Sequence, residues 1–214
     1  MIVALAAQKG GVGRTSTALA LACEWQRKKR KTLVVDCDPQ RSALTWAEVA
    51  AERRRTAPTV VAMAAGLSQP GQLPALAAGY HAVVLDCPPR RDDLVREVLM
   101  LADLALLPCG PGPTDVWALA ESVDLVQKAQ TIRPTLKAAV VITRKQPRTA
   151  IGRGTRDALA AIGLPVLQTE VSYRVTWQEA LATGLAPSTY APTSPAAEEV
   201  RALASELERL VRRG

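Results

Sequence analysis

The feature that most constrains the fold of this 214-residue chain is a glycine-rich segment, Lys9-Gly10-Gly11-Val12-Gly13-Arg14-Thr15-Ser16. It follows an apolar run at 2–6 and precedes a segment of helical character, so a strand, a loop and a helix are expected in that order. In that order, loop amides and the helix N-terminus can surround a phosphate group, and glycine lets the main chain approach it closely. A plain glycine turn would explain one or two of these glycines but not the whole string. The segment therefore predicts a phosphate-binding loop.

Short apolar runs alternate with helical segments along the rest of the chain. Because these runs lack a polar alternate face, they are predicted to be buried on both sides, as the strands of a parallel sheet are. The expected fold class is α/β, with a single doubly wound, mostly parallel sheet, helices on both faces, and residues 1–214 as one domain. The predicted strands are 2–6, 32–36, 82–86, 104–107, 138–143 and 166–169.

The last predicted helix, 195–212, has the clearest periodicity. Val200, Leu203 and Leu207 share one face at three- and four-residue spacing, and Pro195 suits the first turn, so this helix is expected to dock on the body of the protein. The Gly- and Pro-rich stretch 66–74 is expected to be a loop or a short helix. The other predicted helices begin after Thr15 and at 42–55, 91–101, 114–130 and 149–162.

Composition restricts the classes of function. The content of 48% hydrophobic and 22% charged residues is that of a globular protein. No segment has the length of a membrane span or the pattern of a secretory leader, so a cytoplasmic location is expected. The four cysteines lack metal-ligand spacing and are expected to be reduced structural thiols, and a single histidine argues against His-based metal sites. The net charge of +7 favours a polyanionic partner, with a solvated basic surface as the alternative.

Acidic residues stand at the ends of two predicted strands. Asp36 and Asp38 occur in Val-Val-Asp-Cys-Asp-Pro-Gln at 34–40, and Asp86 occurs in Val-Val-Leu-Asp-Cys-Pro-Pro at 83–89. Carboxylates at these strand ends face a phosphate loop, where they can hold Mg²⁺ and orient an attacking water. Any one of them is explained as well by a cap or a turn. All three together with the loop favour a site for a nucleotide and Mg²⁺.

The loop and the acidic segments together resemble the ParA/MinD family of ATPases, and most closely small plasmid-partition ParA proteins of the ParF type. Lys9 in Lys-Gly-Gly-x-Gly is similar to the signature lysine of that family's deviant Walker A motif. The resemblance implies a P-loop NTPase fold that binds ATP or ADP with Mg²⁺. It also implies an ATP-dependent homodimer, in which Lys9 reaches the nucleotide of the partner subunit.

The resemblance also assigns roles to individual residues. Asp38 would position the attacking water, while Thr15, Asp36 and Asp86 would serve the Mg²⁺ shell. Segments 103–115, 141–145 and 191–195 are similar to the family's as well, so the resemblance covers nearly the whole chain. The residues expected to bind nucleotide are Lys9, Gly10, Gly11, Val12, Gly13, Arg14, Thr15 and Ser16, with Thr143, Arg144 and Pro192 near the adenine base.

Arg14 stands where phosphate loops of this kind usually have lysine. A guanidinium is wider than an ammonium and must approach phosphate differently, although it can still pair with two oxygens. We therefore expect Arg14 to act at the phosphates in a weak, partner-stimulated ATPase, because a loose fit stabilises the transition state less. A nucleotide-gated scaffold without hydrolysis is the alternative. Asp38, which would have no task without hydrolysis, counts against it.

The family resemblance also predicts partners. It implies that the ATP-bound dimer binds DNA without sequence preference at the nucleoid, and that a ParB-like or adaptor protein with a basic N-terminal segment stimulates the ATPase. The basic run 27–31 is expected instead to offset the dipole at the end of the first helix. The predicted DNA-binding residues, for which a solvated basic face is the alternative, are Arg144, Lys145, Arg148, Arg153, Arg156 and Arg174.

Two rival classes fit less well. A MinD-like membrane switch would need an amphipathic C-terminal tail with a basic face and bulky apolar anchors, whereas 195–212 carries four glutamates and the chain has no Phe. Stable membrane insertion is therefore not expected. Metal-cluster reductases of the same superfamily need paired cysteines at a dimer seam, which Cys87 and Cys109 do not obviously supply.

Overall fold

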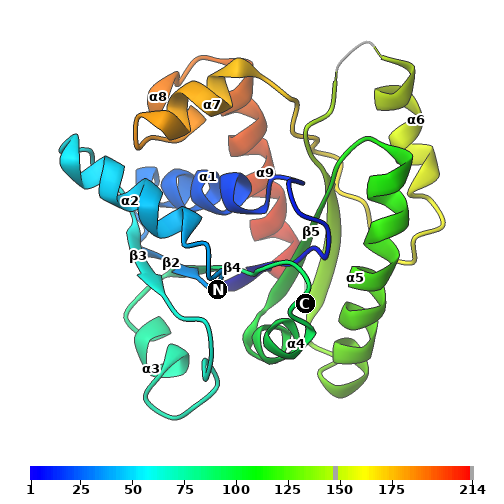
Figure 1. The fold of residues 1–214 in the computed structure, drawn as a ribbon, viewed down its shortest axis with the longest axis horizontal. Helices are drawn as coiled ribbons and strands as arrows, with labels where there is room; N and C mark the ends of the chain where they lie inside the picture. Colours follow the sequence, from blue (N-terminus) through cyan, green and yellow to red (C-terminus); the bar gives the residue numbers. More distant parts are fainter. Residues whose placement is uncertain (147–148, 213–214) are drawn as a thin grey trace.

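The computed structural model describes residues 1–146 and 149–212, which form a single sheet between two layers of helices (Figure 1). The strands are β1 (Ile2–Leu5), β2 (Thr32–Asp36), β3 (Thr59–Ala62), β4 (Ala82–Asp86), β5 (Leu104–Cys109) and β6 (Lys137–Ile142). The helices are α1 (Arg14–Arg27), α2 (Ser42–Glu52), α3 (Leu73–Ala77), α4 (Asp92–Leu101), α5 (Pro113–Ile132), α6 (Ala150–Ala158), α7 (Val175–Ala182), α8 (Pro187–Tyr190) and α9 (Pro195–Arg212).

The sheet has the strand order β3-β2-β4-β1-β5-β6, and every pairing in it is parallel. Neighbouring strands are in register at the functional edge, since Asp36 at the end of β2 pairs with Asp86 at the end of β4. Loops that leave the carboxyl ends of β1, β2, β4 and β5 therefore meet along one edge. The predicted doubly wound α/β fold is confirmed.

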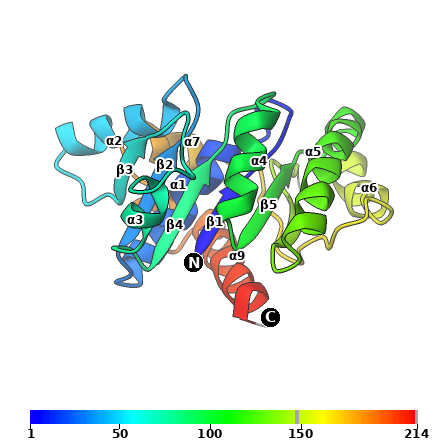
Figure 2. The ribbon, with the colours of Figure 1, turned by 90° about the horizontal axis from the view of Figure 1, so that it is seen from below.

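Two hydrophobic cores lie on opposite faces of the sheet, because successive side chains of each buried strand point to opposite sides. In β1, Val3 and Leu5 join the core under α1, α2, α7 and α9, while Ala4 joins the core under α3, α4 and α5. Figure 2 shows the second group of helices from below. Most residues of β1, β2, β4 and β5 are fully buried, as their uninterrupted apolar runs predict.

The strand predicted at 166–169 is wrong. Val166 makes only an isolated bridge to Val140, and Leu167 donates its amide to the Val140 carbonyl at 2.8 Å. The next two amides, of Gln168 and Thr169, donate instead to the Glu206 carboxylate in α9, at 2.8 and 2.9 Å. A side chain from another element thus replaces the strand partner that these amides would need.

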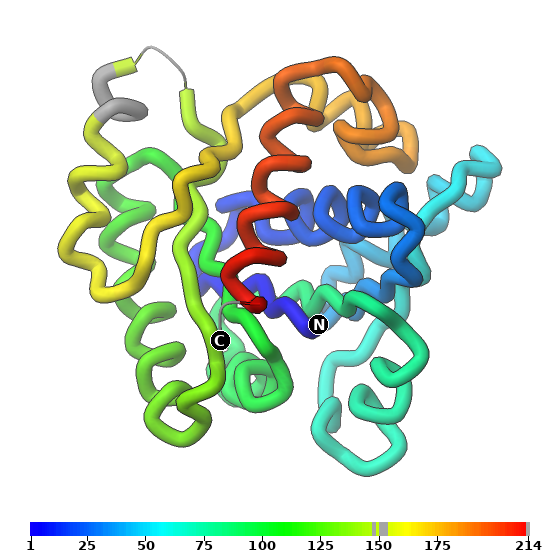
Figure 3. Tube along the Cα trace, turned by 180° about the vertical axis from the view of Figure 1, so that it is seen from behind, coloured from blue at the N-terminus to red at the C-terminus, as the bar shows by residue number. Residues whose placement is uncertain are grey.

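The other differences concern short elements and helix ends. Strand β3 was not predicted because it is a four-residue, half-exposed edge strand. Helices α7 and α8 are also short, with eight and four residues, and were missed. Helix α2 ends at Glu52 and α6 at Ala158, earlier than predicted, whereas α9 has the predicted bounds of Pro195–Arg212. The docking of α9 is confirmed, since Val200, Leu203 and Leu207 are buried in the core that α1 and the sheet share. Figure 3 shows the trace of α9 beside that of α1.

The structure also bears on membrane spans and on the state of the cysteines. Within the described ranges, no helix combines the length and apolarity that a bilayer span would require. All four cysteines are buried and free of disulfides, and burial raises the pKa of Cys23 to about 12. The four cysteines therefore pack in the interior.

Candidate nucleotide site

The glycine-rich loop lies between β1 and α1 and takes a path that requires glycine at two positions. Gly11 and Gly13 have φ angles of 75° and 87°, in the left-handed region that other residues rarely adopt. Gly13 is the N-cap of α1, and its carbonyl accepts the amide of Thr17 at 3.0 Å. The amides of Arg14, Thr15 and Ser16 in the first turn therefore have no acceptor within the helix and are available to an anion.

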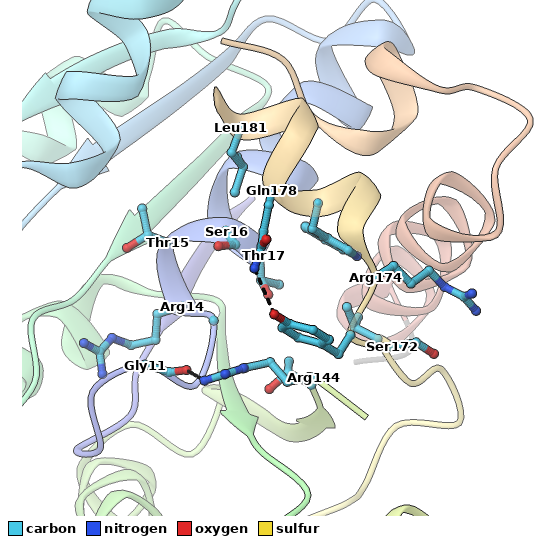
Figure 4. Close-up of a pocket in the computed structure, with 15 residues that line it drawn as sticks. Gly11, Arg14, Thr15, Ser16, Thr17, Arg144, Ser172, Arg174, Gln178 and Leu181 are labelled. Atoms are coloured by element: carbon cyan, nitrogen blue, oxygen red, sulfur yellow. Dashed lines mark hydrogen bonds between the residues drawn. The ribbon is translucent and has the colours of Figure 1, made fainter. Parts of the chain in front are cut away.

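Contacts from other elements hold this loop in place. The Thr143 hydroxyl at the end of β6 donates to the Val12 carbonyl at 2.7 Å, and Arg144 donates to the Gly11 carbonyl (Figure 4). Thr143 is buried, and Arg144 has a φ of 52°. Both were predicted at the adenine base, and the structure gives them a second task. They fix the shape of the phosphate loop.

Gln8 anchors the start of the loop to the segment that follows β4. Its side-chain oxygen accepts the amide of Arg90 at 2.8 Å, and its side-chain nitrogen donates to the Asp92 carboxylate. Its own amide donates to the Ser122 hydroxyl of α5 at 3.0 Å. Gln8 is therefore a buried junction between β1, α4 and α5.

Arg14 does not extend freely into the loop. Its guanidinium donates to the carbonyl of Ala7 and, at 2.8 Å, to the carbonyl of Lys9, while its Nε has no partner among the described residues. Burial lowers the pKa of Arg14 below its ordinary value, and the charge of Asp86 opposes that effect. The side chain is 8% exposed. In this state the Arg14 side chain braces the loop by bridging two of its carbonyls. Its predicted contact with phosphate requires that the guanidinium leave these carbonyls and turn toward the nucleotide.

Lys9 is held within its own subunit. Its ammonium lies 2.5 Å from a carboxylate oxygen of Asp115 and 3.0 Å from the hydroxyl of Thr114, both in the first turn of α5. The Lys9 side chain is 36% exposed, so it stands at the rim of the site. The role in trans that the sequence predicts requires release from Asp115. That acidic partner was not identified in the sequence.

The three acidic candidates have different environments. Asp36 accepts hydrogen bonds from the amides of Ala43 and Leu44 at 2.8 and 3.0 Å, so it caps the start of α2. Asp38 is half-buried and accepts the amide of Gln40 at 2.9 Å. Asp36 therefore has a structural role as a cap, which the sequence left open as the alternative. Its predicted Mg²⁺ role stays a prediction.

Asp86 is the carboxylate that best fits a cation. It is 1% exposed, and neither oxygen accepts a well-formed hydrogen bond from the described residues. Burial raises its pKa to about 7, although the nearby Thr15 hydroxyl and Arg14 guanidinium favour the charged form. A buried carboxylate without a well-formed hydrogen bond, close to the Thr15 hydroxyl, suits Mg²⁺, which takes one or two protein oxygens and keeps its other ligands as water and phosphate. In the part of the chain that the structure describes, no group of three or more His, Cys, Asp or Glu side chains is placed to hold a metal ion by itself.

A cavity of about 350 Å³ extends from the loop toward α7. Thr15, Ser16, Thr143 and Arg144, four of the residues expected to bind nucleotide, line it, and Figure 4 shows the side chains that surround it. Its far wall, missed in the sequence, consists of Ser172, Tyr173, Arg174, Trp177, Gln178 and Leu181.

The far wall offers surfaces for a planar base. The Arg144 guanidinium lies 5.8 Å from the centre of the Tyr173 ring, and Gln178 donates to the Tyr173 hydroxyl at 2.9 Å. The predicted Pro192 does not line the cavity. It is exposed, and its carbonyl accepts Arg201 at 2.8 Å. The aromatic residues of this wall, Tyr173 and Trp177, belong to α7 and the segment just before it, a helix that was not predicted from the sequence.

The predicted DNA-binding residues are mostly committed to other contacts. Lys145 and Arg156 both pair with Glu170, the latter at 3.0 Å, and Arg174 pairs with Glu199 at 2.8 Å. Arg144 is bonded to the phosphate loop. Arg148 lies outside the described residues, and so does the side chain of Arg153. The described members of this group fasten β6, α6, α7 and α9 together.

The geometry defines a nucleotide-binding P-loop domain, and the sequence profile of the CobQ/CobB/MinD/ParA nucleotide binding domain matches residues 3–187. The chain belongs to this family. A relative named "Maintenance of carboxysome distribution protein A", from Halothiobacillus neapolitanus, is 31% identical over 185 residues, which is 86% of this chain and 84% of that protein. The chromosome-partitioning ATPase Soj of Thermus thermophilus is 30% identical and covers 96% of this chain, with 94% of its own length matched.

Solved structures agree on the fold. The ATP complex of Cyanothece McdA has a TM-score of 0.78 at 15% identity, covering 97% of this chain and 96% of that one. The cell division ATPase MinD of Pyrococcus furiosus has a TM-score of 0.77 at 18% identity and covers 98% of both chains. The predicted ParA/MinD-type P-loop fold is confirmed by these neighbours and by the family match.

Proposed function

We propose that this chain is a ParA-type positioning ATPase that binds ATP with Mg²⁺, closes into a homodimer around the nucleotide and hydrolyses it slowly. The observation that carries the proposal is the placement of Lys9 at the exposed rim of a loop whose helix amides are free. An ammonium at the rim can reach a nucleotide bound by a second subunit, whereas one inside the loop could not. Asp38, two residues after the end of β2, is available to orient water.

The chain's own residues support each part of this function. The free amides of α1 would bind the phosphates, Thr15 and Asp86 would hold the cation, and the cavity toward α7 would hold the nucleoside. Bound Mg²⁺ supplies charge that neutralises the transferring phosphoryl group. Lys9 would exchange the Asp115 carboxylate for a phosphate of the partner's nucleotide, so the ion pair with Asp115 holds the lysine until a dimer forms.

Sizing by light scattering tests the dimer. We expect a monomer without nucleotide and with ADP and Mg²⁺, and a dimer with a slowly hydrolysed ATP analogue and Mg²⁺. Asp38→Ala should still dimerise but lose ATP turnover. A monomer in all three conditions, for a protein that melts cooperatively and binds the analogue, would contradict the proposal.

The relatives support a cargo-positioning role, and we propose that the protein performs it in the cytoplasm at the nucleoid. Two proteins named for carboxysome distribution, from Halothiobacillus neapolitanus and Gloeobacter kilaueensis, are 31% and 34% identical to the chain, and the Soj protein is named for chromosome partitioning. Both names describe the distribution of a large cargo. We infer the same class of task here, with a stimulating adaptor that carries a basic N-terminal segment. Co-sedimentation of adaptor and ATPase with and without ATP would test this partner.

A nucleotide-gated scaffold without hydrolysis is the second candidate, and the position of Arg14 favours it. A guanidinium bonded to the Ala7 and Lys9 carbonyls is not free to stabilise charge on the phosphates. Steady-state ATPase assays separate the two functions. Dimerisation with ATP but no turnover above that of Asp38→Ala would support the scaffold.

A further inference from the structure

The two helices α1 and α2 end with the same backbone motif, and in both a basic residue occupies the position usually taken by glycine. After α2, the amides of Arg54 and Arg55 donate to the carbonyls of Ala51 and Ala50 at 2.9 and 2.8 Å. After α1, the amides of Lys29 and Arg30 donate in the same way to Gln26 and Trp25. These are Schellman motifs, whose left-handed residue is most often glycine.

The left-handed residues are Lys29, with a φ of 61°, and Arg54, with a φ of 53°. Glycine adopts this conformation without steric cost, and a residue with a Cβ does not. Folding alone would therefore favour glycine at both positions. The presence of a long cation at each indicates a task for the side chain.

Exposed cations gather at these two helix ends, and we name Lys29, Arg53, Arg54 and Arg55 the helix-end patch. All four are exposed, and their side chains have no hydrogen bond or ion pair to the described residues. Their neighbours behave differently, since Arg27 pairs with Glu24, and Lys28 and Arg30 pair with Glu208 of α9. The neighbours thus perform structural work, and the patch is left facing solvent.

The two halves of the patch are fastened together. The side chain of Gln26, in the last turn of α1, donates to the carbonyl of Ala57, two residues beyond Arg55, at 3.1 Å. Gly184, just after α7, packs so closely on α2 that an added Cβ would lie 2.5 Å from the Cα of Ala50. Both helices end on the same side of the molecule in Figure 1. The cations are therefore presented on a fixed frame.

The helix dipole does not account for the patch. Cations near a helix C-terminus are stabilised by the dipole, but the effect fades within the last turn. Arg54 and Arg55 lie beyond the last helical residue, Glu52. Three consecutive exposed arginines after one helix exceed what the dipole requires.

We propose that the helix-end patch binds the phosphate backbone of DNA without sequence preference, in place of the ion-paired residues of the C-terminal half. Arginine pairs with phosphate through two parallel hydrogen bonds, and such contacts carry affinity but no sequence information. An anionic membrane is the less suitable partner, because surface binding also needs bulky apolar side chains. Polar Glu52 and Thr56 flank the arginines instead.

The location of the patch implies how nucleotide would control it, and this step rests on the proposed function. The 14 residues of α1 separate the patch from the phosphate loop by about 20 Å, so ATP cannot contact the patch. Dimerisation brings two patches onto one DNA molecule, which raises apparent affinity through effective concentration. ATP would thus strengthen DNA binding by changing the oligomeric state rather than the surface.

The test compares two variants that each lose three positive charges. The patch variant carries Arg53→Gln, Arg54→Gln and Arg55→Gln, and the control carries Arg96→Gln, Lys128→Gln and Arg212→Gln, all exposed cations outside the patch. Binding of a random-sequence duplex is measured over a salt series with the ATP analogue, beside sizing and thermal melting. We expect the patch variant to dimerise normally, to bind DNA at least about tenfold more weakly, and to lose about two to three units of salt slope per protomer.

Each other outcome has a defined meaning. Equal losses of DNA affinity in the two variants would contradict the proposed role of the helix-end patch. An undiminished DNA affinity of the patch variant would contradict it as well. So would a wild-type dimer that binds no DNA, or one that binds phosphatidylserine vesicles through the patch but not DNA. A wild-type protein that fails to dimerise would contradict the proposed function instead, and weak low-salt binding by the monomer would still test the patch. An Arg→Lys version of the patch variant should retain most of the binding.

Discussion

The two ends of α1 solve opposite problems with opposite residues. At the N-terminal end, glycines provide left-handed backbone, and side chains from β6, α4 and α5 hold the loop in one shape. At the C-terminal end, left-handed backbone is provided by Lys29, and the cations of the helix-end patch, unlike Lys28 and Arg30 beside it, have no ion pair to the described residues. The comparison separates recognition of a small ligand, which needs a fixed cradle, from attraction of a polymer, which needs only exposed charge.

The largest expected effect is a loss of function at the N-terminal end of α1 alone. Lys9→Ala should lower partner-stimulated ATP turnover by about 100-fold or more, because a cation that completes a phosphoryl-transfer site in trans contributes at least that much. Nucleotide-dependent dimerisation, measured by light scattering, should fall with it.

Lys29→Ala is the matched control at the other end of α1. It should leave turnover within about twofold of the wild type and weaken only DNA binding. If the two lysine variants lost turnover equally, the separation of the two ends would be wrong.

A smaller effect is expected from a variant that should raise ATP turnover at the N-terminal end of α1. Arg14→Lys replaces the guanidinium that braces the loop by a compact ammonium that fits between phosphates, so we expect turnover to rise by about tenfold. Steady-state phosphate release with saturating ATP measures this. Arg14→Gln, which has neither charge nor fork, is the control and should not gain activity. Wild-type turnover at or above that of Arg14→Lys would show that the arginine is the better catalytic group here.

At the C-terminal end, stability and binding should move in opposite directions. Arg54→Gly removes the left-handed strain and one patch cation, so the free energy of unfolding should rise by about 1 kcal/mol while DNA affinity falls a few-fold. The melting temperature would rise by about 2–4 °C for a domain of this size. Arg53→Gly is the control, because Arg53 has an ordinary φ of −87°. It should lose affinity without gaining stability.

The smallest effect concerns the ion pair that restrains Lys9. Asp115→Asn keeps an acceptor for the Gly112 amide, which lies at 3.1 Å, but removes the charge that faces Lys9. Partly exposed ion pairs contribute about 0.2–1 kcal/mol, so the ATP analogue concentration for half-maximal dimerisation should fall by about two- to fivefold. A rise in that concentration would mean that Asp115 aids the dimer instead of delaying it.

Long, strongly patterned elements were predictable from the sequence. Apolar runs without a polar face located β2 and β4 to the residue, and the spacing of Val200, Leu203 and Leu207 located α9. The phosphate loop and its acidic neighbours were recognisable because a fold without a nucleotide site seldom needs both a glycine string and aspartates at neighbouring strand ends. The roles proposed for Lys9, Arg14 and Asp38 stay predictions.

What could not be predicted depends on contacts between distant segments. The Glu206 carboxylate accepts two of the amides that a strand at 166–169 would have used. Nothing in the sequence of that segment indicates this contact. Glu170 and Glu199 pair with three of the arginines and lysines that looked free in the sequence. The far wall of the cavity belongs to α7, an eight-residue helix without clear periodicity, and to the three residues before it. The charge of a residue can be read from the sequence, whereas its ion-pair or hydrogen-bond partner is known only from the fold.

Gln8 has a consequence for how such a loop can change over time or be engineered. Its two side-chain bonds, to the Arg90 amide and to the Asp92 carboxylate, tie the first residue of the loop to the start of α4. A loop transplanted here from an ordinary P-loop protein, with glycine at this position, would lose both bonds and leave α4 without its anchor. A transplant that keeps these contacts therefore has to exchange the loop and the start of α4 together.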